Sequence, residues 1–380
     1  MAEKKNIALF VRSYLPYSQT FIHDEIRAHS EKVHVSIFCQ DTHNMDRFTH
    51  QPVYSCRNAI ERMMYRNFII NPRFDKLLNK GSFDLVHAHF GTGAMYALPF
   101  ARRHKLPLVV TFHGYDVAAL IGRERNKYHN RKYSRKSRKI FEYASLLLAA
   151  STELKSLLIE LGAPKEKVKV YRLGIDLHRF SYTEPQPVNE NEPLRFLMIG
   201  RFTPKKGHIY SINAFKRLKD EGKTATMDFI GSGENEQTCK ELVSSLGLED
   251  SVKFLGIKSS EEISNYLSRS HVLVAPSVTA SDHDRESGLI VIKEAAAVGL
   301  PSIGTWHGGI PEIIEDQKTG LLVPERNIDA LFRAMKYMAV EPQKRVEMGI
   351  LARKKMEAEY DLFERVKELE TLYDQALSGS

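Results

Sequence analysis

The chain has 380 residues, 42% of them hydrophobic and 27% charged, which excludes disordered, collagen-like and membrane-embedded proteins and predicts two domains. The net charge of +8 is unevenly distributed: residues 1–180 hold 30 basic against 16 acidic residues, and residues 181–380 hold 25 against 31. The basic half can face a phosphorylated ligand or an anionic membrane, whereas nucleic acid is disfavoured because no motif for its recognition accompanies the charge.

In the first half, short apolar runs alternate with helical stretches. The runs that predict strands are Asn6–Val11, Val33–Cys39, Asp84–His89, Leu108–Phe112, Leu146–Ala150 and Val168–Leu173. This alternation predicts a parallel sheet with helices on both faces. The first run lies between Lys5 and Arg12 and is too short for a signal peptide or a membrane-spanning helix, so we expect a cytoplasmic protein.

Two segments of the first half are rich in basic residues. Residues 57–74 place Met63, Met64, Phe68, Ile69 and Ile70 beside arginines, and residues 123–139 contain nine Lys or Arg. Solvated surface helices are one interpretation. The other is shallow contact with anionic lipid, which would place the protein peripherally at the inner face of the plasma membrane.

The alternation restarts after a polar, proline-rich linker that follows Tyr182. Strands are predicted at Leu194–Ile199, Thr226–Ile230, Val252–Leu255, Val272–Ala275 and Pro301–Gly304, and the last segment predicts an amphipathic helix. We therefore predict an α/β protein with two doubly wound, Rossmann-like domains, residues 1–180 and 181–358, and a terminal helix, residues 359–380, that packs back on the first domain. Such domains bind ligands at the carboxyl ends of their strands, so facing domains would share a cleft.

The segment GRFTPKKG, Gly200 to Gly207, lies between a predicted strand and a predicted helix. Its glycines let backbone amides approach an anion, the helix N-terminus adds partial positive charge, and Arg201 with Lys206 can neutralise a diphosphate. The spacing is not that of a Walker loop. The alternative interpretation is a surface turn with solvated cations.

Glu286 and Glu294 flank the start of an apolar helical stretch. This spacing allows both carboxylates to point into one cleft. Glu286, near the amides of Ser287 and Gly288, suits sugar hydroxyls, and Glu294 suits a ribose diol. The alternative is a pair of exposed surface acids.

The segment WHGGIPEII, Trp306 to Ile314, is typical of a tight turn that opens a helix, and its predicted function is structural.

No metal or cofactor site is predicted. Asp282, His283 and Asp284 offer ligands to a hard cation, but nearby lysines and arginines already supply positive charge, so these residues are interpreted as an exposed loop. The cysteines, at positions 39, 56 and 239, lack C-x-x-C spacing and favour reduced thiols over a zinc site.

The order of these motifs resembles the retaining glycosyltransferases of family 4, which have the GT-B fold. The resemblance rests on Gly200–Gly207, the Glu-x7-Glu pair, GGIPEI, YRLGIDLHRF (Tyr171–Phe180) and TFHGYD (Thr111–Asp116). A narrower likeness to exopolysaccharide enzymes of the colanic acid type rests on SQTFIHDEI, HAHFG and SDHDRE. Together, these resemblances imply metal-independent transfer of a hexose from a nucleoside diphosphate sugar, with retention of the anomeric configuration. UDP is the favoured carrier and GDP-mannose the next, and the acceptor is a saccharide or a polyprenyl-diphosphate-linked saccharide.

The resemblance also implies residue functions. Arg201 and Lys206 would hold the diphosphate, Glu294 the ribose and Glu286 the sugar, which His113 would also reach. The predicted catalytic residues are His113, Arg201, Lys206 and Glu286. The predicted donor-binding residues are Gly200, Arg201, Lys206, Gly231, Gly256, Ile257, Glu286, Ser287, Gly288, Leu289 and Glu294. The predicted acceptor-binding residues are Ser18, Thr20, His89 and Asp116, in a first domain that lacks the Gly-Gly pair of many family members.

Two alternatives stay open. A nucleotide-sugar epimerase of the same fold would isomerise the donor without an acceptor. A non-catalytic sugar-nucleotide-binding protein would keep the fold without turnover, although retention of all four charged donor-site residues argues against it.

Overall fold

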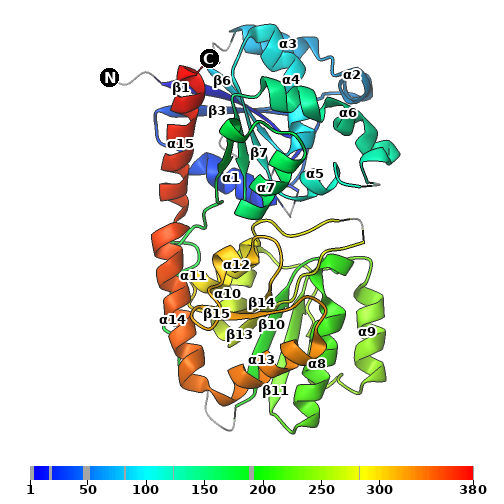
Figure 1. The fold of residues 1–380 in the computed structure, drawn as a ribbon, viewed down its shortest axis with the longest axis vertical. Helices are drawn as coiled ribbons and strands as arrows, with labels where there is room; N and C mark the ends of the chain where they lie inside the picture. Colours follow the sequence, from blue (N-terminus) through cyan, green and yellow to red (C-terminus); the bar gives the residue numbers. More distant parts are fainter. Residues whose placement is uncertain are drawn as a thin grey trace. The chain divides into compact units, whose positions relative to one another are not determined.

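The computed structural model describes residues 4–16, 19–45, 52–80, 83–122, 124–187, 192–281 and 283–379. The chain forms two compact units (Figure 1). Unit 1 comprises Met1–Gly174 and Leu362–Ser380, and unit 2 comprises Ile175–Asp361. The predicted domain limits, residues 180 and 358, differ from these limits by a few residues. None of the helices in the described ranges combines the length and apolar character that a bilayer-spanning segment needs.

Unit 1 contains a seven-stranded parallel sheet in the order β5-β3-β1-β6-β7-β8-β9. The strands are β1 (Lys5–Phe10), β3 (Val33–Cys39), β5 (Val53–Ser55), β6 (Leu85–His89), β7 (Leu108–Phe112), β8 (Leu146–Ala149) and β9 (Val168–Val170), beside a small pair, β2 (Ser13–Tyr14) and β4 (Asp41–Thr42). The helices are α1 (Thr20–Arg27), α2 (Ala59–Phe68), α3 (Pro72–Lys80), α4 (Gly91–His104), α5 (Tyr115–Ala118), α6 (Tyr128–Tyr143), α7 (Thr152–Glu160) and α15 (Leu362–Ser378).

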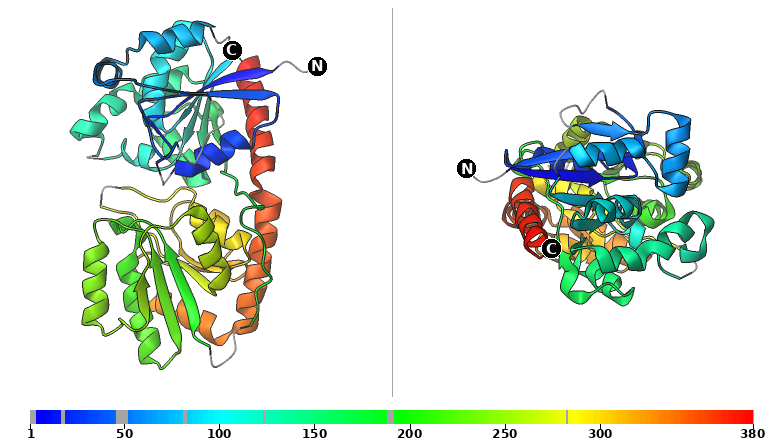
Figure 2. Two further views of the ribbon diagram at one scale, coloured as in Figure 1. Left: turned by 180° about the vertical axis from the view of Figure 1, so that it is seen from behind. Right: turned by 90° about the horizontal axis from the view of Figure 1, so that it is seen from above.

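Unit 2 contains a six-stranded parallel sheet in the order β12-β11-β10-β13-β14-β15, seen from behind in Figure 2. The strands are β10 (Leu194–Ile199), β11 (Ala225–Ile230), β12 (Val252–Phe254), β13 (Val272–Ala275), β14 (Ser302–Thr305) and β15 (Gly320–Val323). The helices are α8 (His208–Asp220), α9 (Glu236–Ser245), α10 (Ser260–Arg269), α11 (Ile290–Ala297), α12 (Ile310–Ile313), α13 (Ile328–Val340) and α14 (Pro342–Glu359).

Both sheets are doubly wound, as predicted. The strand order reverses at β1, which lies between β3 and β6, and at β10, which lies between β11 and β13. The loops that follow neighbouring strands at such a point diverge and leave room for a ligand at their carboxyl ends. The segments to inspect for chemistry are therefore those after β1 and β6 in unit 1 and those after β10 and β13 in unit 2.

Local sequence explains several helix starts. Asn58, Ser151 and Asn327 each accept a hydrogen bond from a backbone N–H in the first turn of α2, α7 and α13. Ser259 and Glu262 form a capping box at the start of α10. These caps fix where four of the helices begin, in agreement with the predicted alternation of strands and helices.

The terminal helix α15 belongs to unit 1, which confirms the prediction that it packs on the first domain. Tyr373 Oη lies 2.8 Å from His87 Nδ1 on β6. Glu370 accepts hydrogen bonds from the backbone N–H and the hydroxyl of Ser30, at 2.7 Å and 2.9 Å. These contacts fix the last helix to the amino-terminal part of the chain.

Candidate active site

The switch point of unit 2 brings an acidic and a basic segment together. Lys206, which follows β10, places Nζ 2.9 Å from Oε1 of Glu286, which lies between β13 and α11. Lys205 Nζ lies 3.7 Å from the same oxygen and 2.9 Å from Asp284 Oδ2. The side chains of Lys206 and Glu286 are 14% and 11% exposed, so this ion pair is largely screened from solvent. Charges of both signs thus meet at the edge where a doubly wound sheet binds ligands.

The ionisation of this cluster follows from its burial and its partners. Burial alone would raise the pKa of Glu286, but Lys206 and Lys205 outweigh it and lower that pKa to about 2. Burial lowers the pKa of Lys206, and the adjacent Glu286 carboxylate opposes that shift. Burial also disfavours charge on Lys205, yet Glu286 and Asp284 raise its pKa. At neutral pH Glu286 is therefore a carboxylate beside two cations.

Two glycines hold the loop after β10 in place. Gly207, at the start of α8, has φ +76°, and a Cβ there would lie 2.2 Å from the Pro276 carbonyl oxygen. Gly231 has φ +136°, and a Cβ there would lie 2.1 Å from the Gly200 carbonyl oxygen. Side chains are excluded at both positions by backbone conformation and by contact. The predicted donor residues Gly200 and Gly231 are thus packed against each other.

The turn after β14 holds the backbone of Glu286. The Gly309 N–H donates to the Glu286 carbonyl oxygen at 3.1 Å, and the Glu286 N–H donates to His307 Nε2 at 2.9 Å. Sequence analysis predicted only a structural turn in this segment and did not single out His307, which is 3% exposed. A histidine directly before paired glycines was the signal available in the sequence.

The other predicted donor residues lie in segments that follow the carboxyl ends of the strands of this sheet. Arg201 and Gly200 directly follow β10, and Gly231 follows β11. Gly256 and Ile257 come after β12, and the Ile257 side chain is 60% exposed. The segment of Ser287, Gly288 and Leu289 leads from Glu286 into α11, which carries Glu294.

Asp282, His283 and Asp284 are the residues that could offer ligands to a hard cation and are predicted to form an exposed loop. Asp282 lies outside the described residues. Asp284 pairs with Lys205, and His283 is exposed with φ +64°. Asp284 is therefore tied to the basic segment.

In unit 1, the half-buried His113 contacts a chain of buried polar groups. His113 Nε2 lies 3.1 Å from His89 Nδ1, and His89 Nε2 lies 3.1 Å from Glu25 Oε1. The Tyr171 hydroxyl donates to Glu25 Oε2 at 3.1 Å. Glu25 comes from α1, His89 from the end of β6 and His113 from the segment after β7. The prediction that His113 lies at the carboxyl end of a strand is met, and Glu25 is a neighbour that the sequence did not reveal.

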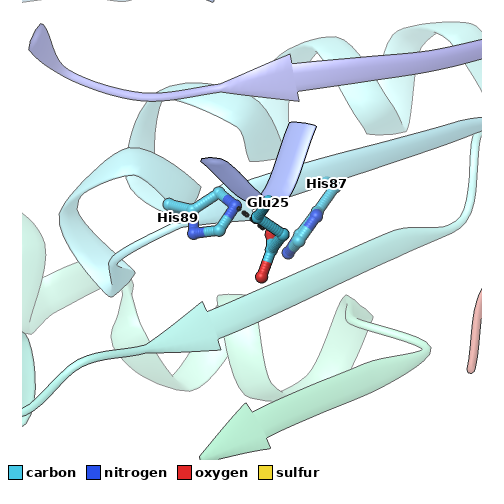
Figure 3. A group of neighbouring side chains, drawn as sticks. All are labelled: Glu25, His87 and His89. Carbon is cyan, nitrogen blue, oxygen red and sulfur yellow. Dashed lines mark ion pairs between the residues drawn. The ribbon is translucent and has the colours of Figure 1, made fainter. Parts of the chain in front are cut away.

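Glu25, His87 and His89 point toward one another (Figure 3), and their potential ligand atoms lie within 4.8 Å of one another, as a metal site would require. Both ring nitrogens of His87 lie 2.8 Å from hydroxyls, those of Tyr373 and Thr111. Burial and the neighbouring His89 lower the pKa of His87, so its ring is neutral. Because the nitrogens of both histidines already have polar neighbours, we interpret the cluster as a group of buried polar side chains rather than a metal site.

His89 and Asp116 were predicted to bind the acceptor, but both are 0% exposed. Asp116 accepts hydrogen bonds from the backbone N–H groups of Gly91, His113 and Gly114 at 2.7, 3.1 and 3.0 Å. Neither side chain is therefore exposed to a solvent-borne acceptor, so the structure does not support direct acceptor contact by His89 or Asp116. Ser18 lies outside the described residues, and Thr20 is half-buried at the start of α1.

Removal of the Asp116 carboxylate should destabilise the protein. Asp116→Ala leaves three backbone donors without their acceptor, and we expect a loss of about 3 kcal/mol of unfolding free energy in urea denaturation. Asp116→Asn, which keeps one side-chain oxygen as an acceptor, should lose less. An Ala variant as stable as the wild type would show that these hydrogen bonds do not hold the segment.

Comparisons with known proteins identify the family of this chain. Two family models match it: "Glycosyltransferase Family 4" over residues 18–179 and "Glycosyl transferases group 1" over residues 182–355. The chain is 34% identical to the amylovoran biosynthesis glycosyltransferase AmsK of Erwinia amylovora over 280 residues, 73% of this chain and 67% of AmsK. The chain is a family 4 glycosyltransferase. The putative colanic acid biosynthesis glycosyltransferase WcaL of Escherichia coli is also 34% identical, over 70% of this glycosyltransferase and 64% of WcaL.

The glycosyltransferase thus spans about two thirds of the length of these two relatives. Among solved structures, sucrose-phosphate synthase from Thermosynechococcus elongatus matches with a TM-score of 0.81 at 20% identity, over 99% of this chain and 100% of that one. Anabaena HepE, solved with UDP and glucose, matches with a TM-score of 0.79 at 20% identity, over 97% and 100% of the two chains. These likenesses confirm the predicted two-domain fold.

Proposed function

We propose that this glycosyltransferase moves a hexose from a nucleoside diphosphate sugar, with UDP as the favoured carrier, to a saccharide acceptor during exopolysaccharide synthesis. The observation that carries the proposal is the Lys206–Glu286 pair, 2.9 Å apart at the switch point of unit 2. A cation beside a carboxylate matches two adjacent parts of a sugar nucleotide: Lys206 binds the diphosphate, and Glu286 accepts hydrogen bonds from sugar hydroxyls. The names of AmsK, WcaL and UDP-bound HepE support the polysaccharide context and the carrier.

Charge development explains where the binding energy is used. As the bond between the anomeric carbon and the diphosphate oxygen breaks, negative charge grows on the leaving group. Lys206, Arg201 and the amino-terminal end of α8 offset that charge without a metal ion. The acceptor oxygen then bonds to the anomeric carbon on the same face, and its proton passes to the departing diphosphate. The sugar configuration is retained.

A donor screen tests this proposal. A ligand that binds only the folded state raises the melting temperature, so UDP-, GDP-, ADP- and CMP-sugars are compared by thermal shift. We expect a UDP-sugar to give the largest shift and NMR of the product to show retained anomeric configuration. An isomerised donor formed without acceptor would instead identify an epimerase. Binding without turnover of any acceptor would favour a non-catalytic protein.

Metal independence is the next expectation. Because the donor site supplies lysine and arginine where many transferases use a divalent cation, transfer should continue at a similar rate in excess EDTA. The rate with added Mg²⁺ or Mn²⁺ serves as the control. A loss of activity in EDTA that Mg²⁺ restores would contradict the expectation and would direct attention to the residues around Asp284.

We also propose that unit 1 contacts an anionic membrane. On and after α2, Ile60, Met63, Phe68 and Ile70 are exposed by 68%, 52%, 67% and 44%. The last turn of α2 touches the basic helix α6, because Lys132 Nζ donates to the carbonyl oxygens of Arg66 and Asn67 at 2.6 and 2.8 Å. Apolar side chains beside a basic helix suit shallow insertion among acidic headgroups. Ile69, predicted to share this face, is instead buried with φ +58°.

Liposome flotation tests the membrane surface. The double variant Ile60→Ser/Phe68→Ser should lose at least about 10-fold in partitioning to vesicles that contain phosphatidylglycerol, since two large apolar side chains no longer leave water. Val340→Ser removes a side chain that is 45% exposed on α13 and serves as the matched control. Equal flotation of all three proteins, or binding that is the same on neutral vesicles, would contradict the proposal.

A further inference from the structure

His307 and Glu325 form a second layer behind Glu286. His307 follows β14, Glu325 follows β15, and both strands end at the edge of the sheet where Glu286 lies. His307 Nε2 lies 2.9 Å from the Glu286 backbone nitrogen, and His307 Nδ1 lies 2.8 Å from Glu325 Oε1. The His307 side chain is 1% exposed. The buried His307 ring therefore connects the Glu325 carboxylate to the backbone of Glu286, the residue proposed to bind the sugar.

These two contacts determine which ring nitrogen of His307 carries the proton. A backbone N–H can only donate, so Nε2 must present its lone pair to Glu286. The neutral ring then carries its proton on Nδ1, which donates to Glu325. A proton on Nε2 would face the Glu286 N–H and break the hydrogen bond. The Nδ1–H form of His307 is thus required for its contact with Glu286.

Glu325 is itself held as an ionised acceptor. Thr279, which follows β13, donates its backbone N–H to Glu325 Oε2 at 2.8 Å and its hydroxyl to Oε1 at 3.2 Å. Arg326 Nη1 lies 3.2 Å from Oε2. Burial alone would raise the pKa of Glu325, but the hydrogen bonds from Thr279 and His307 lower it. The carboxylate therefore favours the proton on the Nδ1 side of His307.

We propose that Glu325 and His307 are positioning residues for the donor sugar: Glu325 holds the Nδ1–H form of His307, and His307 Nε2 holds the backbone of Glu286. The inference rests on the proposed function, because it concerns Glu286 as the sugar ligand. Gly309 N–H holds the Glu286 carbonyl at 3.1 Å, so one turn grips both polar backbone groups of this residue. Such support keeps a binding group within the small tolerance that oriented chemistry allows.

Calorimetric titration with UDP and with UDP-glucose separates this function from general stability. If the thermal-shift screen selects the GDP-mannose pair, GDP and GDP-mannose replace them. We expect His307→Ala to bind UDP within about 2-fold of the wild type and the sugar conjugate about 10-fold more weakly, the effect of one lost hydrogen bond. His307→Gln can accept from the Glu286 N–H and should recover most of the difference. Equal weakening of both ligands, or of neither, would overturn the inference.

Glu325→Gln provides a variant that keeps the histidine and nearly the same side-chain shape. It should weaken binding of the sugar conjugate in the same selective way. Lys318→Ala, an exposed residue between β14 and β15 whose side chain is 72% exposed, is the control and should bind both ligands as the wild type does. Selective loss in Lys318→Ala would point to a nonspecific effect and count against the inference.

NMR of the imidazole nitrogens reports which nitrogen of His307 carries the proton, and this measurement does not depend on catalytic activity. The His307 signal, identified by its absence in His307→Gln, should show a proton on Nδ1 in the wild type and a mixture in Glu325→Gln. A wild-type proton on Nε2 would overturn the inference.

The binding data also separate the two proposals. If Glu286→Gln binds the sugar conjugate normally, the proposed function fails. If only Glu286→Gln weakens it and His307→Ala does not, this inference alone fails.

Discussion

Lys206→Ala should lower turnover by about 10²-fold or more, because it removes a positive charge placed where the leaving diphosphate develops negative charge. Lys206 Nζ lies 2.9 Å from Glu286 Oε1, so the positive charge is held within the proposed site. Initial rates at saturating donor and acceptor, with product quantified by chromatography, measure the effect.

The variant needs two controls. Lys216→Ala removes a half-buried lysine of α8 that pairs with Asp220, and its turnover should match the wild type. Loss of Lys206 also leaves Glu286 with Lys205 as its remaining close cation, 3.7 Å away, so melting temperatures must be compared before rates are interpreted. A stable Lys206→Ala protein with near-normal turnover would remove this residue from the mechanism.

Glu286→Gln should also reduce turnover by about 10²-fold, because the neutral amide accepts sugar hydroxyls less strongly and no longer orients Lys206. Initial rates at saturating donor and acceptor measure the loss. The two residues contact each other, so the double variant Lys206→Ala/Glu286→Gln should lose less than the product of the single losses. Strictly multiplicative losses would indicate that the pair does not act as one unit.

The sequence predicted the central strands well because each is a nearly uninterrupted apolar run. In the two main sheets, the strands missed were β5 and β15, and the short pair β2 and β4 was missed as well. Val53–Ser55 is short and half-buried, so it has no apolar signature, and Gly320–Val323 offers only four residues after a glycine turn. Edge strands of this kind are defined by pairing with a neighbour, which a single-sequence pattern does not report.

The donor segment was predicted in the same way. Glycines, cations and a strand-to-helix junction occur together within Gly200–Gly207, so the local chemistry is visible along the chain. The resemblance implied that Lys206 and Glu286 share one site. The structure brings them together because β10 pairs with β13, so the segments after these strands share one edge of the sheet.

The supporting residues could not be predicted because their contacts depend on the sheet pairing. His307 reaches Glu325 only because β14 and β15 are adjacent, with Gly304 opposite Leu322. Glu25 approaches His89 from α1, far away in the sequence, and His89 approaches His113 because β6 pairs with β7. Pattern analysis identified His89 and Asp116 as chemically interesting but assigned them to the acceptor, because burial is a property of the folded chain.

The central claim is that Lys206 and Glu286 bind adjacent parts of one sugar nucleotide, Lys206 the diphosphate and Glu286 the sugar. Calorimetric affinities for a free nucleoside diphosphate and its sugar conjugate, measured on both variants, test it most directly. Lys206→Ala should weaken both ligands to a similar extent, whereas Glu286→Gln should weaken only the conjugate and leave the free diphosphate bound at least as tightly. Loss of diphosphate affinity in Glu286→Gln, or unchanged diphosphate affinity in Lys206→Ala, would contradict the claim.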